Sequence, residues 1–313
     1  MTRAAERELA MFIAGWPERP MARSTTLTEL RRNAEIENAT IPLPADCAVE
    51  PLQAAGITGE RIEPKGADAT GAILYHHGGG HVFGSPAAHR HLVARLAEAA
   101  GLVAFNMAYS LAPERPFPAG INDALANYRF LFDQGIAPER IIVAGDSAGG
   151  NVTVALLLLA AEAGLPMPAG VYLLSPWLDL GPRTPHPGYT LDKDPLLATD
   201  AIQAWSKAYR GNEHPSHPKI SPIFADLKDF PITLIQAGGA EALLEDSFAF
   251  ARKLALAGTH VQLNVWKDQV HAWPLFHADM PISGGTAIAQ AGAWMKRAIK
   301  SGGRSRRSDI SRF

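Results

Sequence analysis

The stretch IIVAGDSAGGN, residues 141–151, decides the fold class of this chain. Its first residues, 141–144, form a continuous apolar run that is typical of a strand buried on both faces. The residues from Asn151 onward have the composition of a buried helix. Ser147 stands between the two segments, with Gly145 before it and Gly149 after it. The stretch therefore predicts a strand, a tight turn that presents a serine, and a helix.

Small residues on both sides of Ser147 fit the needs of a nucleophilic serine. Gly145 to Gly149 form a G-x-S-x-G motif, in which glycines let the strand and the helix approach closely while the serine backbone is strained. The start of the following helix favours negative charge near the serine oxygen. A phosphate-binding loop is excluded because Asn151 stands where that motif requires lysine. Taken alone, the motif also fits a glycine-rich turn with an incidental serine.

The rest of the chain alternates short apolar runs with longer helical segments. The expected strands are 72–76, 103–107, 141–144, 171–174, 232–236 and 261–266. The expected helices are 89–100, 121–134, 151–163, 245–257 and 286–300. This alternation predicts an α/β fold with a mostly parallel central sheet flanked by helices.

Two regions interrupt this alternation. Residues 1 to about 45 have a helical pattern before any expected strand, and residues from about 181 to 218 contain a helix that Thr199 or Asp200 is expected to cap. Insertions at the carboxyl ends of parallel strands lie over the site of such sheets, so both regions are expected to form a helical cap. Residues 301–313 are expected to be a solvated tail. The whole chain, 1–313, is interpreted as one domain.

Composition and charge limit the classes of partner. The chain has 313 residues and a net charge of −2, so nothing favours nucleic acid or an anionic membrane. Cys47 is the only cysteine, which excludes an intrachain disulfide. The first residues lack a signal-peptide pattern, and the longest apolar run, 152–161, is far too short to span a bilayer. A cytoplasmic protein is expected, and general frequency makes a homodimer the assembly to test first.

A second glycine-rich segment, HHGGGHVFG at 76–84, follows the first expected strand. Consecutive glycines leave backbone N–H groups unobstructed by side chains. Gly79 and Gly80, together with the N–H of Ala148, are therefore expected to form an oxyanion hole, a set of donors for a developing negative oxygen.

Three histidines around these glycines offer a competing interpretation as a metal site. The common zinc motif places its histidines on a helix, and three consecutive glycines disfavour a helix at His76, His77 and His81. His77 is interpreted instead as an anchor for the loop. No metal or cofactor is expected.

A serine hydroxyl is a weak nucleophile that needs a base, and the base needs an acid to orient it. His271 is the expected base because it follows the last expected strand, and its alternatives are His214, His217, His260 and His277. Glu241 is the expected acid because it follows the preceding strand, and Asp246 is the runner-up. Asp146, beside the nucleophile, is interpreted as a structural hydrogen-bonding residue.

Four blocks in this order resemble the bacterial hormone-sensitive-lipase-like esterases, a family of α/β-hydrolases. They are HGGG at 77–80, YSLAPERPFPA at 109–119, GDSAGG at 145–150, and the pair GGAEALLEDS at 238–247 with VHAW at 270–273. The resemblance extends from about residue 72 to 276. LSPWLDL at 174–180 and SPIFADL at 221–227 are further similar stretches.

This resemblance implies an α/β-hydrolase fold with a helical cap and a serine esterase without cofactors. It implies a nucleophile, acid and base at Ser147, Glu241 and His271, with oxyanion donors at Gly79, Gly80 and Ala148. The chain departs from the family twice: the family acid is more often aspartate, and Ser110 replaces an arginine that would make a structural ion pair.

We therefore expect a carboxylic ester hydrolase that forms a serine acyl-enzyme with short-chain acyl esters as its small-molecule substrates. A lactone hydrolase would use the same residues, and a small-molecule receptor without catalysis is the alternative from another class. Aromatic residues expected either to line the substrate pocket or to pack in the core are Phe12, Trp16, Phe83, Trp205 and Trp273.

Overall fold

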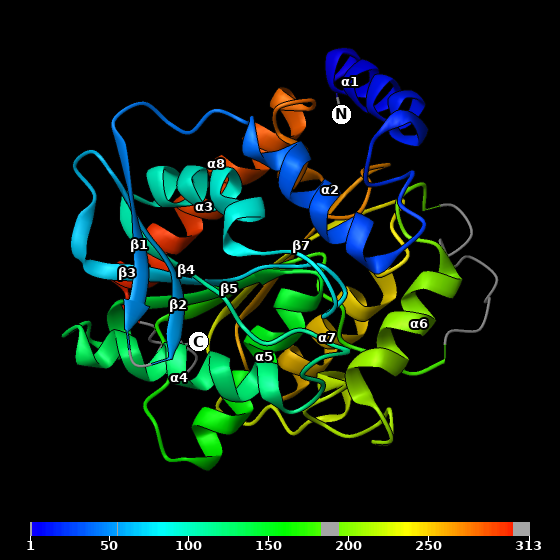
Figure 1. The fold of residues 1–313 in the computed structure, drawn as a ribbon. Coiled ribbons are helices and arrows are strands. Elements are labelled where there is room, and N and C mark those ends of the chain that lie inside the picture. Colours follow the sequence, from blue (N-terminus) through cyan, green and yellow to red (C-terminus); the bar gives the residue numbers. More distant parts are fainter. Residues whose placement is uncertain (1, 55, 183–193, 303–313) are drawn as a thin grey trace, which may run out of the picture.

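One sheet crosses the whole molecule in the computed structural model, which describes residues 2–54, 56–182 and 194–302. Eight strands of the described residues form it: β1 (Cys47–Ala54), β2 (Ile57–Pro64), β3 (Asp68–His76), β4 (Leu102–Met107), β5 (Ile141–Asp146), β6 (Gly170–Leu174), β7 (Thr233–Gly238) and β8 (Val261–Trp266). Their spatial order is β1-β2-β4-β3-β5-β6-β7-β8, and Figure 1 shows β1 and β2 at one edge. Strands β3 to β8 pair in parallel, as expected, whereas β1 and β2 are antiparallel additions at one edge.

The hairpin of β1 and β2 was not among the expected strands. β1 contains Glu50 and Pro51, and a proline inside an apolar run argues against a central strand. The structure places β1 at the edge of the sheet, where most of its residues are exposed or half-buried. An edge strand carries little hydrophobic signal, which explains the omission.

Helices cover both faces of the sheet. The helices that pack against its strands are α3 (Pro86–Ala100), α4 (Ala119–Asp133), α5 (Ala148–Glu162), α7 (Leu244–Leu256) and α8 (Pro281–Lys300). The other α-helices of the described residues are α1 (Arg3–Gly15), α2 (Leu27–Ala39) and α6 (Thr199–Arg210). The five expected helices are confirmed, and each begins between one and five residues earlier than expected. The start of α3, for example, is set by Ser85, whose hydroxyl accepts a hydrogen bond from the N–H of Ala88 at 3.1 Å.

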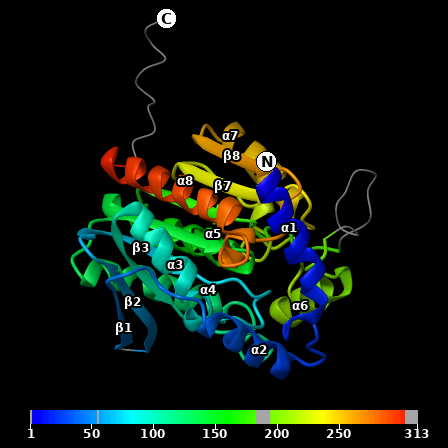
Figure 2. The same ribbon diagram turned by 90° about the horizontal axis from the view of Figure 1, so that it is seen from above.

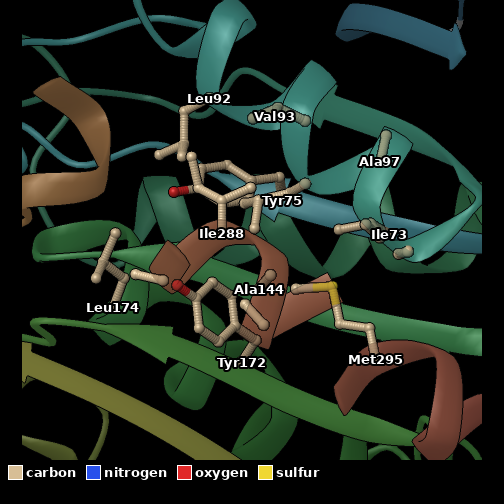
Figure 3. Packing of buried hydrophobic residues seen from close by; sticks show 14 of the residues in the cluster. Ile73, Tyr75, Leu92, Val93, Ala97, Ala144, Tyr172, Leu174, Ile288 and Met295 are labelled. Carbon is tan, nitrogen blue, oxygen red and sulfur yellow. The ribbon is translucent and has the colours of Figure 1, made fainter. Parts of the chain in front are cut away.

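The two faces hold separate hydrophobic cores. Ile73 and Tyr75 of β3 point toward α3 and α8, where they pack with Leu92 and Met295 (Figure 3). The intervening Leu74 belongs to the other cluster, with side chains of α4, α5 and α7. Successive side chains of a strand point to opposite faces, so a continuous apolar run serves both cores. Each fully buried side chain of this size contributes roughly 1.5–3 kcal/mol by leaving water.

Helices α1, α2 and α6 lie along one side of the molecule, and both views agree on this placement (Figures 1 and 2). The prediction that Thr199 or Asp200 caps α6 is wrong. The N-cap is Ala198, without a side-chain hydrogen bond, and Asp194 instead accepts bonds from the N–H groups of Leu196 and Leu197 just before the helix. Asp200 lies in the first turn, where a negative charge favours the helix dipole.

Two expectations concern residues that the structure leaves undescribed. Most of the expected insertion before α6, residues 183–193, and most of the expected tail, residues 303–313, lie outside the described residues. Within the part of the chain that is described, no helix has the length and apolar character needed to cross a membrane.

Candidate active site

Ser147 lies at the tight turn between β5 and α5 with φ 52° and ψ −120°. Its N–H donates to the carbonyl oxygen of Leu174 at 2.9 Å, which ties the turn to β6. A Cβ on Gly149 would lie 2.0 Å from the carbonyl oxygen of His76, and one on Gly145 would lie 2.4 Å from that of Gly149. The strand and the helix therefore approach too closely for any residue larger than glycine. A positive φ in a non-glycine residue costs on the order of 1–3 kcal/mol and is common at functional sites.

The loop after β3 turns its glycines toward the same space. Gly79 has φ 113° and Gly80 has φ 59°, and the carbonyl oxygen of Gly79 accepts the N–H groups of Val82 and Phe83 at 2.9 Å each. A Cβ on Gly79 would lie 2.1 Å from the carbonyl oxygen of Phe83. The loop thus folds back on itself in a conformation that only glycine adopts easily. Ala148 begins α5, and the first N–H of a helix has no acceptor within that helix.

Asp146 joins the glycine loop to the turn at Ser147. Its Oδ1 accepts the hydroxyl of Tyr75 at 2.8 Å and the N–H of Gly78 at 2.9 Å, and its Oδ2 lies 3.5 Å from Nε2 of His89. Burial alone would raise the pKa of Asp146, but His89 and the Tyr75 hydroxyl together hold that pKa below its usual value. Asp146 therefore acts as the structural hydrogen-bonding residue that the sequence suggested.

His271 and Glu241 come together from two different loops. Nδ1 of His271 lies 3.2 Å from Oε2 of Glu241. Glu241 is fully buried in the loop after β7, and His271 is 8% exposed in the loop after β8. The runner-up acid has another role, because Oδ2 of Asp246 accepts the N–H groups of Leu178 and Asp179 at 2.7 and 2.9 Å. The geometry brings the imidazole to Glu241.

Burial and charge act on this pair together. Burial of the imidazole lowers the pKa of His271, but its hydrogen bond to Glu241 and the charge of that carboxylate outweigh burial and raise the pKa above its ordinary 6.5. Burial raises the pKa of Glu241, and the hydrogen bonds from His271 and Ser175 oppose that rise. Loss of the shared proton would leave one uncompensated negative charge in a buried place, so the pair holds that proton firmly.

Four of the predicted catalytic and oxyanion-hole residues line a cavity of about 460 Å³. Ser147, His271, Gly79 and Gly80 all line it. Its other walls are mostly apolar and include Trp16, Met21, Leu30, Ala34, Phe83, Leu196, Leu197, Ala201, Trp205, Leu275 and Phe276. Most of these residues come from the segment around α1 and α2, from the turn before α6 and from α6 itself, whereas Phe83 lies in the glycine loop and Leu275 and Phe276 lie in the short helix 273–276.

The five aromatic candidates separate into lining and packing residues. Trp16, Phe83 and Trp205 line the cavity, and the rings of Phe83 and Trp205 meet edge to face with centroids 5.5 Å apart. The expectation that Trp273 contacts substrate is wrong, because its side chain is fully buried and packs against Trp266 in the core. Phe12 is also a packing residue, buried with its ring tilted against that of Phe276 at a centroid distance of 4.8 Å.

The three histidines near the glycines lie against tyrosine rings, His76 and His77 both beside Tyr109 and His81 against Tyr209. His77 stacks on Tyr109, whose hydroxyl donates to the carbonyl oxygen of His77, and His81 stacks on Tyr209 with centroids 3.7 Å apart. Burial lowers the pKa of His76, His77 and His81 to about 3 each. Within the described ranges, no group of three or more His, Cys, Asp or Glu side chains is arranged to hold a metal ion.

Ser110 keeps a polar contact where the resemblance implied an arginine. Its N–H donates to Oδ2 of Asp123 at 2.9 Å, and its hydroxyl donates to the same oxygen. Ser110 therefore contacts an acidic side chain, which also lies 3.8 Å from Nη1 of Arg115.

Three residues around the site escaped sequence reasoning. His89 lines the cavity from α3, Asp194 lines it and accepts the N–H of Ala242 at 2.8 Å through Oδ2, and Ser175 accepts the N–H of Ala272 at 3.0 Å. The sequence carried weak signals for two of them, since Asp194 and Ser175 each precede a proline after a turn or strand. Nothing in the helical pattern of α3 distinguished His89.

Known proteins are similar to this chain in both sequence and fold. A profile of the α/β-hydrolase fold family matches residues 73–275. An acetyl-hydrolase of Streptomyces hygroscopicus is 38% identical over 245 residues, 78% of this chain and 81% of the relative, and an esterase of Acinetobacter venetianus is 36% identical over 74% and 77% of the two chains. A crystal structure of an esterase from the bacterial hormone-sensitive lipase family superposes with a TM-score of 0.89 at 36% identity, covering 96% of this chain and all of the other.

Proposed function

The chain belongs to the α/β-hydrolase family, among its hormone-sensitive-lipase-like esterases, and we propose that it hydrolyses short-chain acyl esters through a serine acyl-enzyme. Hydrolysis of carboxylic esters is the activity that its esterase and acetyl-hydrolase relatives support. The observation that carries the proposed mechanism is that Ser147, His271, Gly79 and Gly80 line one cavity.

In the first half of the reaction, the hydroxyl of Ser147 attacks the ester carbonyl carbon while Nε2 of His271 accepts its proton. Glu241 holds the imidazole in the required tautomer through Nδ1 and stabilises the imidazolium that forms. The N–H groups of Gly79, Gly80 and Ala148 stabilise the tetrahedral oxyanion, each by roughly 3 kcal/mol in this kind of chemistry. His271 then gives the proton to the leaving alcohol, and the acyl group stays on Ser147.

The second half repeats these steps with water. His271 accepts a proton from a water molecule, which attacks the acyl carbon, and the same N–H groups stabilise the second tetrahedral oxyanion. Collapse returns the proton from His271 to the oxygen of Ser147 and releases the carboxylic acid. Every proton in this cycle passes through one imidazole, and no metal or cofactor enters the balance.

The preference for short acyl chains rests on the walls of the cavity. Trp205 of α6 lies against the glycine loop, since a Cβ on Gly80 would lie 2.6 Å from its ring. Together with Phe83, this ring limits the space beside the oxyanion donors. The name of the Streptomyces relative, an acetyl-hydrolase, also supports a small acyl group. We propose that α1, α2 and α6 act as the cap over this cavity.

The first test is hydrolysis of p-nitrophenyl acetate, butyrate, octanoate and decanoate by the wild type and by Ser147→Ala. We expect kcat/KM to fall from butyrate to decanoate, and kcat to fall by roughly 10⁴-fold or more in the variant because the nucleophile is lost. A panel of lactones in the same assay separates an esterase from a lactone hydrolase.

Labelling with a fluorophosphonate supplies the direct evidence for the nucleophile. Mass spectrometry should find one adduct, on Ser147, and none in Ser147→Ala. Ser216→Ala is the control, since Ser216 is an exposed serine that does not line the cavity. An unlabelled wild type, or equal rates for wild type and Ser147→Ala, would refute the mechanism.

A further inference from the structure

Ser175 occupies a strained position at the carboxyl end of β6. It has φ 46°, it is fully buried, and its N–H donates to the carbonyl oxygen of Gln236 at 2.7 Å. Positive φ is uncommon outside glycine, and a glycine would adopt this backbone without strain. A serine here indicates that the side chain supplies something that the turn itself does not need.

The hydroxyl of Ser175 makes contacts with both halves of the acid–base pair. It acts on the Glu241 carboxyl as a hydrogen-bonding neighbour that opposes the rise in the pKa of Glu241 caused by burial. It also accepts the N–H of Ala272, the residue next to His271, at 3.0 Å. Ala272 itself has φ 48°, so the backbone beside His271 is strained as well and needs a fixed partner. One buried hydroxyl thus links the acid to the backbone that carries the base.

This link matters more for a glutamate than it would for an aspartate. Glutamate has one more rotatable bond than aspartate, so its carboxylate can adopt more conformations. Oε2 of Glu241 must stay within hydrogen-bond reach of Nδ1 of His271, at 3.2 Å here. A donor fixed by β6 restricts the carboxylate to the rotamer that meets the imidazole.

We propose that Ser175 is a positioning residue for ester hydrolysis, whose hydroxyl holds the Glu241 carboxylate and the backbone beside His271 in one arrangement. This inference rests on the proposed function, because it assigns Ser175 to the same acid and base. Ser175 does not line the cavity and is not expected to touch substrate.

The proposed role of Ser175 predicts a change in the pH dependence of kcat/KM. The charged groups that act on His271 are Glu241, Asp194 and Asp146, and Ser175 adds an uncharged donor to the Glu241 carboxylate. Donation to a carboxylate stabilises its ionised form. Loss of the Ser175 hydroxyl should therefore raise the pH at which the pair gives up its shared proton. Because His271 acts as a base only after that proton is lost, the acid limb of the kcat/KM profile should move to higher pH.

The experiment compares Ser175→Ala and Ser175→Gly with the wild type over pH 5–9 on p-nitrophenyl butyrate. Both variants lose the hydroxyl, but the glycine also relieves the strained backbone, so one of the two folds even if strain limits the other. We expect kcat to fall about 10- to 100-fold, as for other hydrogen bonds to charged groups, with little change in KM. The acid limb should move upward in both variants.

Ser221→Ala is the matched control. Ser221 is equally buried and accepts a backbone N–H, that of Leu180, at 2.8 Å, without contacting the acid–base pair. It should lower thermal stability and leave the pH profile unchanged. If the wild type is active and the acid limb is unshifted in both Ser175 variants, the inference about Ser175 is overturned. If the wild type is inactive and is not labelled by the fluorophosphonate, the proposed function itself is refuted.

Discussion

Two carboxylate–imidazole pairs flank Ser147, and they differ in how they are held. In one, Glu241 meets Nδ1 of His271 at 3.2 Å, and both residues lie in loops after strands. In the other, Asp146 ends β5 and lies 3.5 Å from Nε2 of His89 on helix α3. All four side chains are buried.

The surroundings of each carboxylate give the pairs different uses. Asp146 also accepts the Tyr75 hydroxyl and the N–H of Gly78, so its pKa is held low and its position is fixed to the glycine loop. The Glu241–His271 pair instead holds its proton firmly, with the pKa of His271 raised. A proton acceptor has to change its charge during the reaction, whereas a structural carboxylate has to keep its charge. The same two functional groups thus serve either purpose, depending on their hydrogen-bond partners.

Replacing the acid Glu241 should give the largest difference between the two pairs. Glu241→Gln should lower kcat on p-nitrophenyl butyrate by roughly 10³- to 10⁴-fold, because an amide cannot stabilise the imidazolium and favours the wrong tautomer. Asp246→Asn is the matched control, since that carboxylate bonds to the backbone of Leu178 and Asp179. It should cost thermal stability and change kcat by less than about 10-fold. The reverse ranking would assign the acid to Asp246.

The second pair should show a smaller and different effect. His89→Ala removes the partner of Oδ2 of Asp146 and should lower both the melting temperature and kcat, the latter by roughly 10-fold, because the glycine loop is less firmly held. His89→Gln keeps an N–H donor and should restore most of the rate. Stopped-flow or steady-state kinetics with a thermal melt for each variant test this. Equal damage in both variants would mean that imidazole, and not the hydrogen bond, is required.

The smallest expected change concerns Asp194, which lies beside the first pair. Its charge raises the pKa of both His271 and Glu241, so Asp194→Asn should lower the pH at which the pair loses its proton. The acid limb of kcat/KM should then move to lower pH, opposite in sign to Ser175→Ala. The single asparagine oxygen can accept either the N–H of Ala242 or those of Leu196 and Leu197, so the melting temperature should also fall. The shift of the acid limb is therefore measured relative to the plateau rate of the same variant. If the acid limb of the Asp194→Asn variant moves to higher pH, the charge of Asp194 does not raise the pKa of the pair.

Much of the fold was predictable because its signals are local. The parallel strands β3 to β7 contain apolar runs, β8 alternates apolar and polar residues, and the five helices between and after them are long amphipathic or apolar segments. The edge hairpin was missed because Pro51 and the charged residues of β1 hide it. The start of α8 was missed because Gly284 and Gly285 weaken the helical signal, although Gly284 packs closely against His277.

The candidate site divides in the same way. Ser147, Gly79 and Gly80 are recognisable because each stands in a motif whose neighbours must be small for backbone reasons. Glu241 was preferred over Asp246 because it lies in the loop after the strand, whereas Asp246 lies inside the expected helix 245–257, and the family resemblance agreed with that choice. Trp273 was misplaced because an aromatic residue next to the base has the same composition signal whether it faces the cavity or the core.

By itself, the sequence determined the strand–turn–helix around Ser147, the glycine loop and the order of serine, acid and histidine. Those features depend on backbone conformation and on residues close together in the chain. Only the tertiary structure decided that Glu241 meets His271, that His89 lies against Asp146, and that Ser175 holds the backbone beside the base. Each of these contacts joins segments at least 30 residues apart in the sequence. Their distances depend on how the strands align in the sheet, and local sequence patterns do not specify that alignment.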